Sequence, residues 1–235
     1  RLCDMGKAVQ QIRTAIAEKQ KIIVFGDYDV DGITATCVLL RYLRSLGADA
    51  DYYIPNRLSE GYGLSCAAMD ALYEKGVRLI VTVDSGVTAF EEAAYAKQLG
   101  MKMVITDHHE CREQMPDAEA VVNPRRPACA YPFTELAGVG VAFKLICALA
   151  EAEHLQQMLD AYADLVALGT VADVMPIIGE NRIIVAYGLE RMAVTQNLGL
   201  EMLLREAGQK SRRLTASVIS FILAPRINAA GRMGN

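Results

Sequence analysis

Carboxylate side chains gather in the short segment Gly26–Gly32, which follows an apolar run at 21–25. The segment holds Asp27, Asp29 and Asp31 and leads directly into a predicted helix. A dinucleotide-binding fold would place a glycine-rich loop here, so that backbone N–H groups could approach a pyrophosphate. Three carboxylates would repel a phosphate unless a cation lay between them. The segment therefore predicts a metal site.

Asp27, Asp29, Asp31 and Gly32 also fit the first half of an EF-hand calcium loop. That loop needs a glutamate at its twelfth position, which is Val38 here, and a helix where this chain has an apolar strand pattern. The calcium loop is excluded on both counts. The remaining alternative is a solvated acidic turn in which Asp29 or Asp31 caps the following helix.

Residues that can bind metal also follow two later apolar runs. Asp84 follows one run, and Asp107, His108 and His109 follow the next. In open parallel sheets, ligands bind beyond the carboxyl ends of the strands, so these groups should converge with the first loop. Adjacent side chains on an extended segment point in opposite directions. We therefore expect one histidine to bind a metal while the other faces the substrate.

A further carboxylate, Asp173, ends an apolar helical pattern shortly before Pro176. Taken alone it reads as a turn residue, but it could also be delivered to the same sheet edge. The candidate ligands are Asp29, Asp31, Asp84, His108 and Asp173. This set exceeds what one ion needs, and oxygen ligands with an imidazole suit two Mn²⁺ or Mg²⁺ ions, with Mn²⁺ the better match. Two ions roughly 3.5–4 Å apart can drive phosphodiester hydrolysis, which is the predicted reaction class.

Apolar runs typical of strands alternate with amphipathic patterns, which predicts βαβ units. The predicted strands are 21–25, 50–54, 78–83, 102–106 and 119–122. The predicted helices are 32–47, 64–75, 87–99, 139–151, 155–169, 198–207 and 214–223. The fold class is α/β, a largely parallel five-stranded sheet flanked by helices, with a helical C-terminal half. We expect one unit with a seam at 123–132, rather than two independent domains.

Composition and net charge limit the class of protein and the compartment that we expect. The net charge of −4 argues against binding a phosphate backbone through bulk charge alone. No apolar run approaches the ~20 residues of a membrane span, and no export signal is seen. Six cysteines lie at least 18 residues apart, which fits neither a zinc motif nor a disulfide scaffold. We expect a soluble cytoplasmic protein with reduced, mostly buried thiols, and an excised piece of a longer chain.

The motifs together are similar to those of a known family. Asp107-His108-His109 after a strand, an upstream Asp-x-Asp-x-Asp-Gly at 27–32 and the intervening Asp84 resemble the DHH phosphoesterase superfamily over essentially the whole chain. Further segments resemble the RecJ-type single-strand DNA exonucleases in particular. These are 26–32, 55–63, 123–124, 138–144 and 224–232.

The resemblance implies roles for the candidate residues. The first-motif residues Asp29 and Asp31 would be metal ligands, as would His108 and Asp173, while Asp84 would bridge two ions. His109 would contact the scissile phosphate, and Asp107 would orient the histidine region. Many members carry a ligand histidine four residues before the first paired aspartate, and this chain has Phe25 there. The share of Asp27 in metal binding is therefore left open.

The resemblance also gives a meaning to basic and aromatic residues. The expected substrate contacts are Arg57, Tyr62, Gly138, Gly140, Lys144, Arg226, Asn228 and Arg232. Free amides at the start of the helix opened by Gly138 and Gly140 could receive a phosphate, and Tyr62 could stack on a base. The alternative is that the glycines permit close packing, Lys144 is solvated and Tyr62 lies in the core.

The function implied is 5′→3′ hydrolysis of single-stranded DNA with two ions per site, in DNA repair and recombination. The whole protein would carry this activity, and residues 1–235 alone would show little or none. Residues 1–235 would be a catalytic domain: 1–124 its metal-binding part, 125–209 its helical part, and 210–235 the start of a connection to a further lobe. A monomer is expected, with a single-strand-binding protein or a helicase as partner and no membrane. The alternatives are a DHH phosphodiesterase for short oligonucleotides or cyclic dinucleotides, and a catalytically silent scaffold.

Overall fold

The computed structural model describes residues 1–57, 60–61, 63–127, 129–209 and 214–233, without the side chains of residues 232 and 233. Its strands are β1 Lys21–Phe25, β2 Ala50–Tyr53, β3 Val77–Val83, β4 Lys102–Thr106 and β5 Ala120–Val122. The first helices are α1 Met5–Ala17, α2 Val30–Ser45, α3 Cys66–Glu74, α4 Phe90–Gln98 and α5 Gly138–Ala150. Beyond α5 the chain is helical: η1 Ala152–His154, α6 Leu155–Ala172, α7 Gly179–Met192, α8 Leu198–Glu206, α9 Ala216–Val218, η2 Ile219–Leu223 and α10 Ala224–Met233.

The five strands form one parallel sheet in the order β2-β1-β3-β4-β5. From β1 the chain continues to β2 on one side of the sheet, and from β3 it continues to β4 and β5 on the other side, so the strand order reverses between β1 and β3. A crevice forms at such a reversal, beyond the carboxyl ends of the strands. Phe25 pairs with Thr82 and Val83 with Thr106, so β1, β3 and β4 end at nearly the same level. This topology confirms the predicted α/β class.

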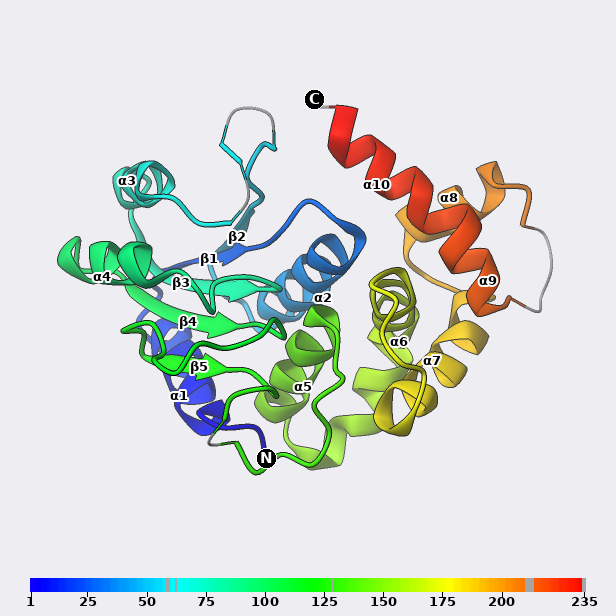
Figure 1. The fold of residues 1–235 in the computed structure, drawn as a ribbon, viewed down its shortest axis with the longest axis horizontal. Helices are drawn as coiled ribbons and strands as arrows, with labels where there is room; N and C mark the ends of the chain where they lie inside the picture. Colours follow the sequence, from blue (N-terminus) through cyan, green and yellow to red (C-terminus); the bar gives the residue numbers. More distant parts are fainter. Residues whose placement is uncertain (58–59, 62, 128, 210–213, 234–235) are drawn as a thin grey trace.

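Strands with two apolar faces require helices on both sides. One face carries Ile23, Phe25, Ile80 and Ile105, which pack with α3 and α4. The other face packs with α1, α2 and α5, and the same buried cluster continues through α6 and α7 to Ala224. In Figure 1 the later helices accordingly lie beside α2 and α5, to one side of the sheet. One apolar core thus links the sheet to the helical half.

Several helices differ from the sequence-based expectation. Neither α1 nor α7 was predicted: alanines carry much of the buried face of α1, and α7 buries Ile184 while exposing Ile183, so its periodicity is weak. The expected helix at 214–223 instead continues to Met233 through the π-helical turn η2. Pro225 lacks the N–H that an α-helix would use, and a widened turn is one way to accommodate this.

Two further expectations, on membrane-spanning segments and on the burial of the cysteines, can be compared with the structure. In the part of the chain described, no helix combines the length and the apolar character needed to cross a membrane. None of the six cysteines, all of which lie among the described residues, forms a disulfide; Cys66 is exposed and the other five are only partly buried. The expectation of mostly buried thiols was therefore wrong: Cys37, Cys111, Cys129 and Cys147 pack against the core but keep part of their surface exposed.

Candidate metal centre

The candidate site lies where β1, β3 and β4 end. The loop after β1 carries the carboxylates of Asp27, Asp29 and Asp31, the loop after β3 carries Asp84, and His108 follows β4. These three strands are neighbours in the sheet, so their carboxyl ends lie together, next to the starts of α2 and α5 (Figure 1). The topology thus brings together residues that are 80 positions apart in sequence.

Asp29 and Asp31 have local tasks in addition to any ligand role. Asp29 is the N-cap of α2, where its Oδ1 accepts a hydrogen bond of 2.9 Å from the N–H of Gly32. Asp31 is buried, and its carboxylate accepts bonds of 2.6 Å and 2.8 Å from the N–H groups of Gly138 and Val139. The positive end of α5 therefore stabilises a buried carboxylate that belongs to α2.

This arrangement corrects two sequence-based expectations. The amide of Gly138 is not free to receive a phosphate, because Asp31 accepts its hydrogen bond. Gly140 is buried, and a Cβ there would lie 3.3 Å from Leu136, so the glycines serve close packing. Lys144 is not a free cation either, since it pairs with Glu180 of α7 and lies 6.0 Å from the ring centre of Tyr131.

His108 is surrounded by carboxylates from three elements. Its Nε2 lies 3.1 Å from Asp84 Oδ1, 3.7 Å from Asp173 Oδ2 and 3.8 Å from Asp31 Oδ2. Asp173 is the C-cap of α6, so the helical half does deliver a carboxylate to the sheet edge. The structure therefore brings together the histidine and three of the predicted carboxylate ligands.

The backbone is adapted to hold Asp84 in this position. Asp84 has φ +58°, a left-handed conformation that few residues other than glycine adopt. A Cβ on Gly138 would lie only 2.4 Å from Asp84 Oδ1, so glycine is required where α5 meets this carboxylate. Strained backbone of this kind persists where the surroundings over-determine it, and it clusters at functional sites.

His109 is held by Asp107. Asp107 Oδ1 accepts hydrogen bonds from the N–H groups of His108 and His109 and lies 2.7 Å from His109 Nδ1, while Oδ2 accepts from the N–H of Val87. The two histidine rings lie 4.6 Å apart at 53°. The expectation that they point in opposite directions was wrong, because β4 ends at Thr106 and the two histidines no longer belong to an extended strand.

Among the residues that the structure describes, three groups of side chains have ligand atoms close enough to share an ion, with the atoms of each group within 4.8 Å of one another. They are Asp27, Asp29 and Asp84; Asp84, His108 and His109; and Asp31, His108 and Asp173. Asp84 belongs to two of the groups and His108 to two. Such overlap is what a pair of ions with a shared carboxylate requires.

Three buried polar atoms of the site make no hydrogen bond within the described chain. These atoms are Asp84 Oδ1, Asp173 Oδ2 and His108 Nδ1, none of which has a hydrogen bond there. Unpartnered buried polar atoms are rare, and an ion is one of the recognised explanations. Carboxylate oxygens with an imidazole are also a donor set that Mn²⁺ accepts. The residues present therefore fit a divalent metal centre.

The electrostatics of the carboxylates favour the same conclusion. Burial raises the pKa of Asp27 to about 6, with the charge of Asp29 acting in the same direction. Burial followed by the charge of Asp84 raises the pKa of Asp31, and burial followed by the charge of Asp29 raises that of Asp84. Burial raises the pKa of Asp173 as well. Cations would be needed to keep all these groups ionised together.

The Asp107–His109 pair behaves differently. Burial alone would raise the pKa of Asp107, but its hydrogen bond to His109, the charge of that histidine and the N–H of Val87 outweigh burial and lower it. The hydrogen bond to Asp107 in turn raises the pKa of His109. Asp107 is therefore a charged anchor that keeps His109 protonated to higher pH.

The other residues singled out by the sequence, Phe25 and the remaining candidate substrate contacts, lie in different parts of the structure. Phe25 lies in the core and stacks on Tyr53 at 5.1 Å, away from the ligands. The guanidinium of Arg57 lies 5.1 Å from the ring centre of Tyr28, on the acidic loop. Asn228 of α10 accepts a bond of 3.2 Å from the N–H of Val30. Arg226 is exposed, and its Nη1 donates to Ile222 O at 2.6 Å.

Two of the predicted contacts cannot be placed. Tyr62 and the side chain of Arg232 lie outside the described residues. The backbone of α10 nevertheless approaches the acidic loop, because a Cβ on Gly231 would lie 2.7 Å from Tyr28 O. The last motif of the chain thus lies beside the first.

Sequence analysis assigned no role to Asn123, although it follows a strand as the other site residues do. Its side chain is fully buried, donates to His109 O at 2.9 Å and accepts from the N–H of Arg125 at 2.8 Å. Asn123 therefore fixes the backbone that follows the histidines. Its position directly after β5 was the available signal.

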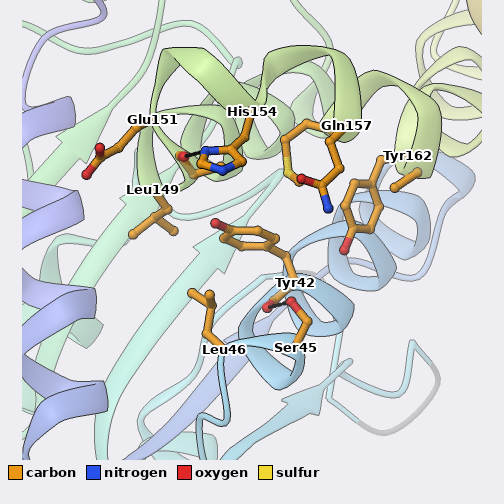
Figure 2. A pocket seen from close by; sticks show the side chains of 11 residues that line it. Tyr42, Ser45, Leu46, Leu149, Glu151, His154, Gln157 and Tyr162 are labelled. Atoms are coloured by element: carbon orange, nitrogen blue, oxygen red, sulfur yellow. Dashed lines mark hydrogen bonds between the residues drawn. The ribbon is translucent and has the colours of Figure 1, made fainter.

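A groove on another part of the molecule does not compete with this site. Figure 2 shows an open groove of about 610 Å³ between α2, α5 and α6, with Tyr42, Leu46 and Tyr162 facing it. Tyr42 is eleven residues along α2 from Asp31, which places it about 16 Å away at the rise of an α-helix. His154 at its rim bonds to Ala150 O at 2.7 Å. The groove therefore lies at the far end of α2 from the ligands.

Residues 21–170 match the family model described as "DHH family, N-terminal domain". The chain belongs to the DHH family. The matched region contains every candidate ligand of this DHH domain except Asp173, which lies three residues beyond it.

Individual relatives and structures are similar to this DHH chain over nearly its whole length. "Single-stranded-DNA-specific exonuclease RecJ" of Bacillus subtilis (strain 168) is 47% identical over 97% of this chain and 28% of its own length. The Escherichia coli (strain K12) protein of that name is 41% identical, over 99% and 42%. "Crystal structure of exonuclease RecJ bound to manganese" superposes with a TM-score of 0.90 at 38% identity, over 100% of this chain and 59% of that one. The chain thus spans less than half the length of these two curated relatives.

Proposed function

We propose that this DHH chain binds two divalent ions, Mn²⁺ or Mg²⁺, and hydrolyses phosphodiester bonds of single-stranded DNA as a 5′→3′ exonuclease of RecJ type. The observation that carries the proposal is the overlap of the ligand groups at Asp84, whose buried Oδ1 has no hydrogen bond in the described chain. The relatives named as single-stranded-DNA-specific exonucleases support the substrate, and the manganese in the name of the similar structure supports the metal.

The geometry suggests a division of the ligands between the two ions. Asp27 and Asp29 would hold one ion together with Asp84, and Asp31, His108 and Asp173 would hold the other. This assignment makes Asp27 a metal ligand. Asp27 lies beside Asp29 and Asp84 and would replace the ligand histidine that many family members carry where this chain has Phe25. When bound, two such ions activate a water molecule and stabilise charge on the phosphate oxygens.

His109 and Asp107 would contribute to the reaction through the substrate rather than as metal ligands. Asp107 is buried and holds His109 through Nδ1, which fixes the ring and raises its pKa. A protonated imidazole beside the ligands can donate a hydrogen bond to an oxygen of the scissile phosphate. This hydrogen bond becomes stronger as negative charge develops on that oxygen in the transition state. Arg57, exposed in the loop after β2 and placed over the ring of Tyr28 on the acidic loop, would attract the strand from outside.

The proposal has further parts that rest on the resemblance to RecJ rather than on a contact in the structure. Residues 1–124 would form the metal-binding part, 125–209 the helical part and 210–235 the start of a connection to another lobe. The protein would act as a cytoplasmic monomer in DNA repair and recombination. A single-strand-binding protein or a helicase would be its partner.

The test uses the whole protein and compares hydrolysis of labelled single-stranded DNA, duplex DNA, a dinucleotide and a cyclic dinucleotide with and without Mn²⁺. We expect mononucleotides to be released from single-stranded DNA with Mn²⁺ only, and no release by Asp84→Asn. Asp49→Asn, a change at an exposed carboxylate, is the control and should retain activity. Hydrolysis of the dinucleotides alone would instead support the short-substrate phosphodiesterase, and Mn²⁺ binding without any hydrolysis would contradict the proposal.

A further inference from the structure

The helix α6 ends in an unusual way directly beside the metal centre. The N–H of Met175 bonds to Thr170 O at 3.3 Å and the N–H of Val174 bonds to Val171 O at 3.2 Å. This pair of bonds is the Schellman motif, which places one residue in the left-handed conformation. That residue is Val174, with φ +57°.

Valine is a poor choice for this position. A β-branched side chain with positive φ is a genuine outlier, and the position is usually glycine. Four other helices of this chain do have glycine after their C-cap residue, with φ between 70° and 78°. They are α2 with Gly47, α3 with Gly76, α4 with Gly100 and α8 with Gly208. The backbone of α6 would accept glycine equally well, so the valine needs another reason.

Packing within the described chain does not supply that reason. The side chain of Val174 is 87% exposed, and Ile177 and Ile178 beside it are 39% and 57% exposed. Only Met175 in this segment reaches the core. We call Val174, Ile177 and Ile178 the apolar rim. Its three apolar side chains are exposed within five residues of one another, and the first is held by a strained backbone.

The rim is covalently attached to the metal centre. Val174 follows Asp173, whose carboxylate lies 3.7 Å from His108 Nε2. A phosphate bound at the ligands would place the rest of its nucleotide near the edge of the site. Residues 174–178 carry no charged side chain, so this edge suits the uncharged part of a nucleotide rather than another phosphate.

We propose that Val174, supported by Ile177 and Ile178, contacts the base of the nucleotide whose phosphodiester lies at the metal centre. The inference rests on the proposed function and deepens it. Bases of a single strand are unpaired and can turn away from their neighbours, whereas those of a duplex are held by pairing and stacking, and contact with a base face is tolerant of sequence because every base has such a face. The apolar rim would therefore favour single-stranded over double-stranded substrate without reading its sequence.

The experiment removes the valine side chain and the strain together. Val174→Gly should raise the melting temperature and leave Mn²⁺ affinity unchanged, while kcat/KM on single-stranded DNA falls roughly tenfold, the effect of one good apolar contact. The decisive arm uses a strand with an abasic analogue at the nucleotide being released. On that strand wild type and Val174→Gly should be equal, because the contacted base is absent.

A matched control exists at the end of α1. Lys19 occupies the same position of a Schellman motif, with φ +53°, and the N–H of Gln20 bonds to Ala15 O at 2.8 Å. Lys19 precedes β1 and so lies at the opposite edge of the sheet from the metal centre. Lys19→Gly should raise the melting temperature while leaving kcat/KM unchanged on both strands.

The outcomes separate this inference from the proposed function. Wild-type protein that releases no nucleotide with Mn²⁺ would contradict the proposed function itself. If wild type is active, an unchanged kcat/KM in Val174→Gly would overturn the inference. An equal loss on the normal and abasic strands would also overturn it, since the rim would then contact something other than the base, such as another part of the protein.

Discussion

Replacing Asp27 with asparagine should reveal the cost of burying a carboxylate in the metal-free site. Asp27 is 3% exposed, and burial raises its pKa from 3.8 to about 6. As the pH rises through this interval, the unfolded chain releases a proton that the folded chain retains, so unfolding becomes easier. The lost stability reaches about 3 kcal/mol above pH 6, at 1.36 kcal/mol per pKa unit. Asparagine keeps an oxygen that can accept the N–H of Tyr28 but carries no charge to be penalised.

The assay is urea unfolding of both proteins in EDTA at several pH values. About half of the loss is already present at pH 5, so the variant should gain about 1.4 kcal/mol on the wild type between pH 5 and pH 8. Saturating Mn²⁺ should reverse the order at pH 8, because the wild type then gains an ionised ligand. A stability difference that does not change with pH in EDTA would refute the reasoning about Asp27.

Further changes test other parts of the site. Asp84→Asn and His108→Ala should each abolish nucleotide release, measured with labelled single-stranded DNA, and wild-type turnover in either would overturn its role as a ligand. Gly138→Ala forces a Cβ to within 2.4 Å of Asp84 Oδ1 and should weaken Mn²⁺ binding at least tenfold by calorimetry, whereas Gly6→Ala, which meets nothing within 4 Å, should not. Asp107→Asn should lower the pKa of His109, measured by an NMR titration, because the carboxylate that raises it is removed; an unmoved pKa would show that Asp107 does not set it.

The local pattern of the sequence was sufficient for the sheet and for the convergence of the ligands. The strands at 21–25 and 102–106 were predicted at their observed bounds, because buried parallel strands are continuous apolar runs with little ambiguity. Knowing that the strands are parallel was then enough to place Asp84 and His108 at one edge. These inferences depend only on local pattern and on a rule of topology.

The errors arose where a long-range partner decides what a residue does. The amide of Gly138 is taken by Asp31, 107 positions away, and no local pattern indicates that contact. Lys144 pairs with Glu180 on α7, a helix whose weak periodicity left it unpredicted. Valine at 174 looked unremarkable in sequence, because its positive φ follows from how α6 ends rather than from residue type. Partner choice and backbone conformation of this kind require the assembled fold.

The central claim is that two ions share Asp84 between the ends of β1, β3 and β4. Crystals grown with Mn²⁺ and measured at the manganese absorption edge test it most directly. We predict two anomalous peaks, one beside Asp27 and Asp29 and the other beside His108 and Asp173, each in contact with Asp84. A single peak, or peaks that leave Asp84 without a metal contact, would contradict the two-metal account.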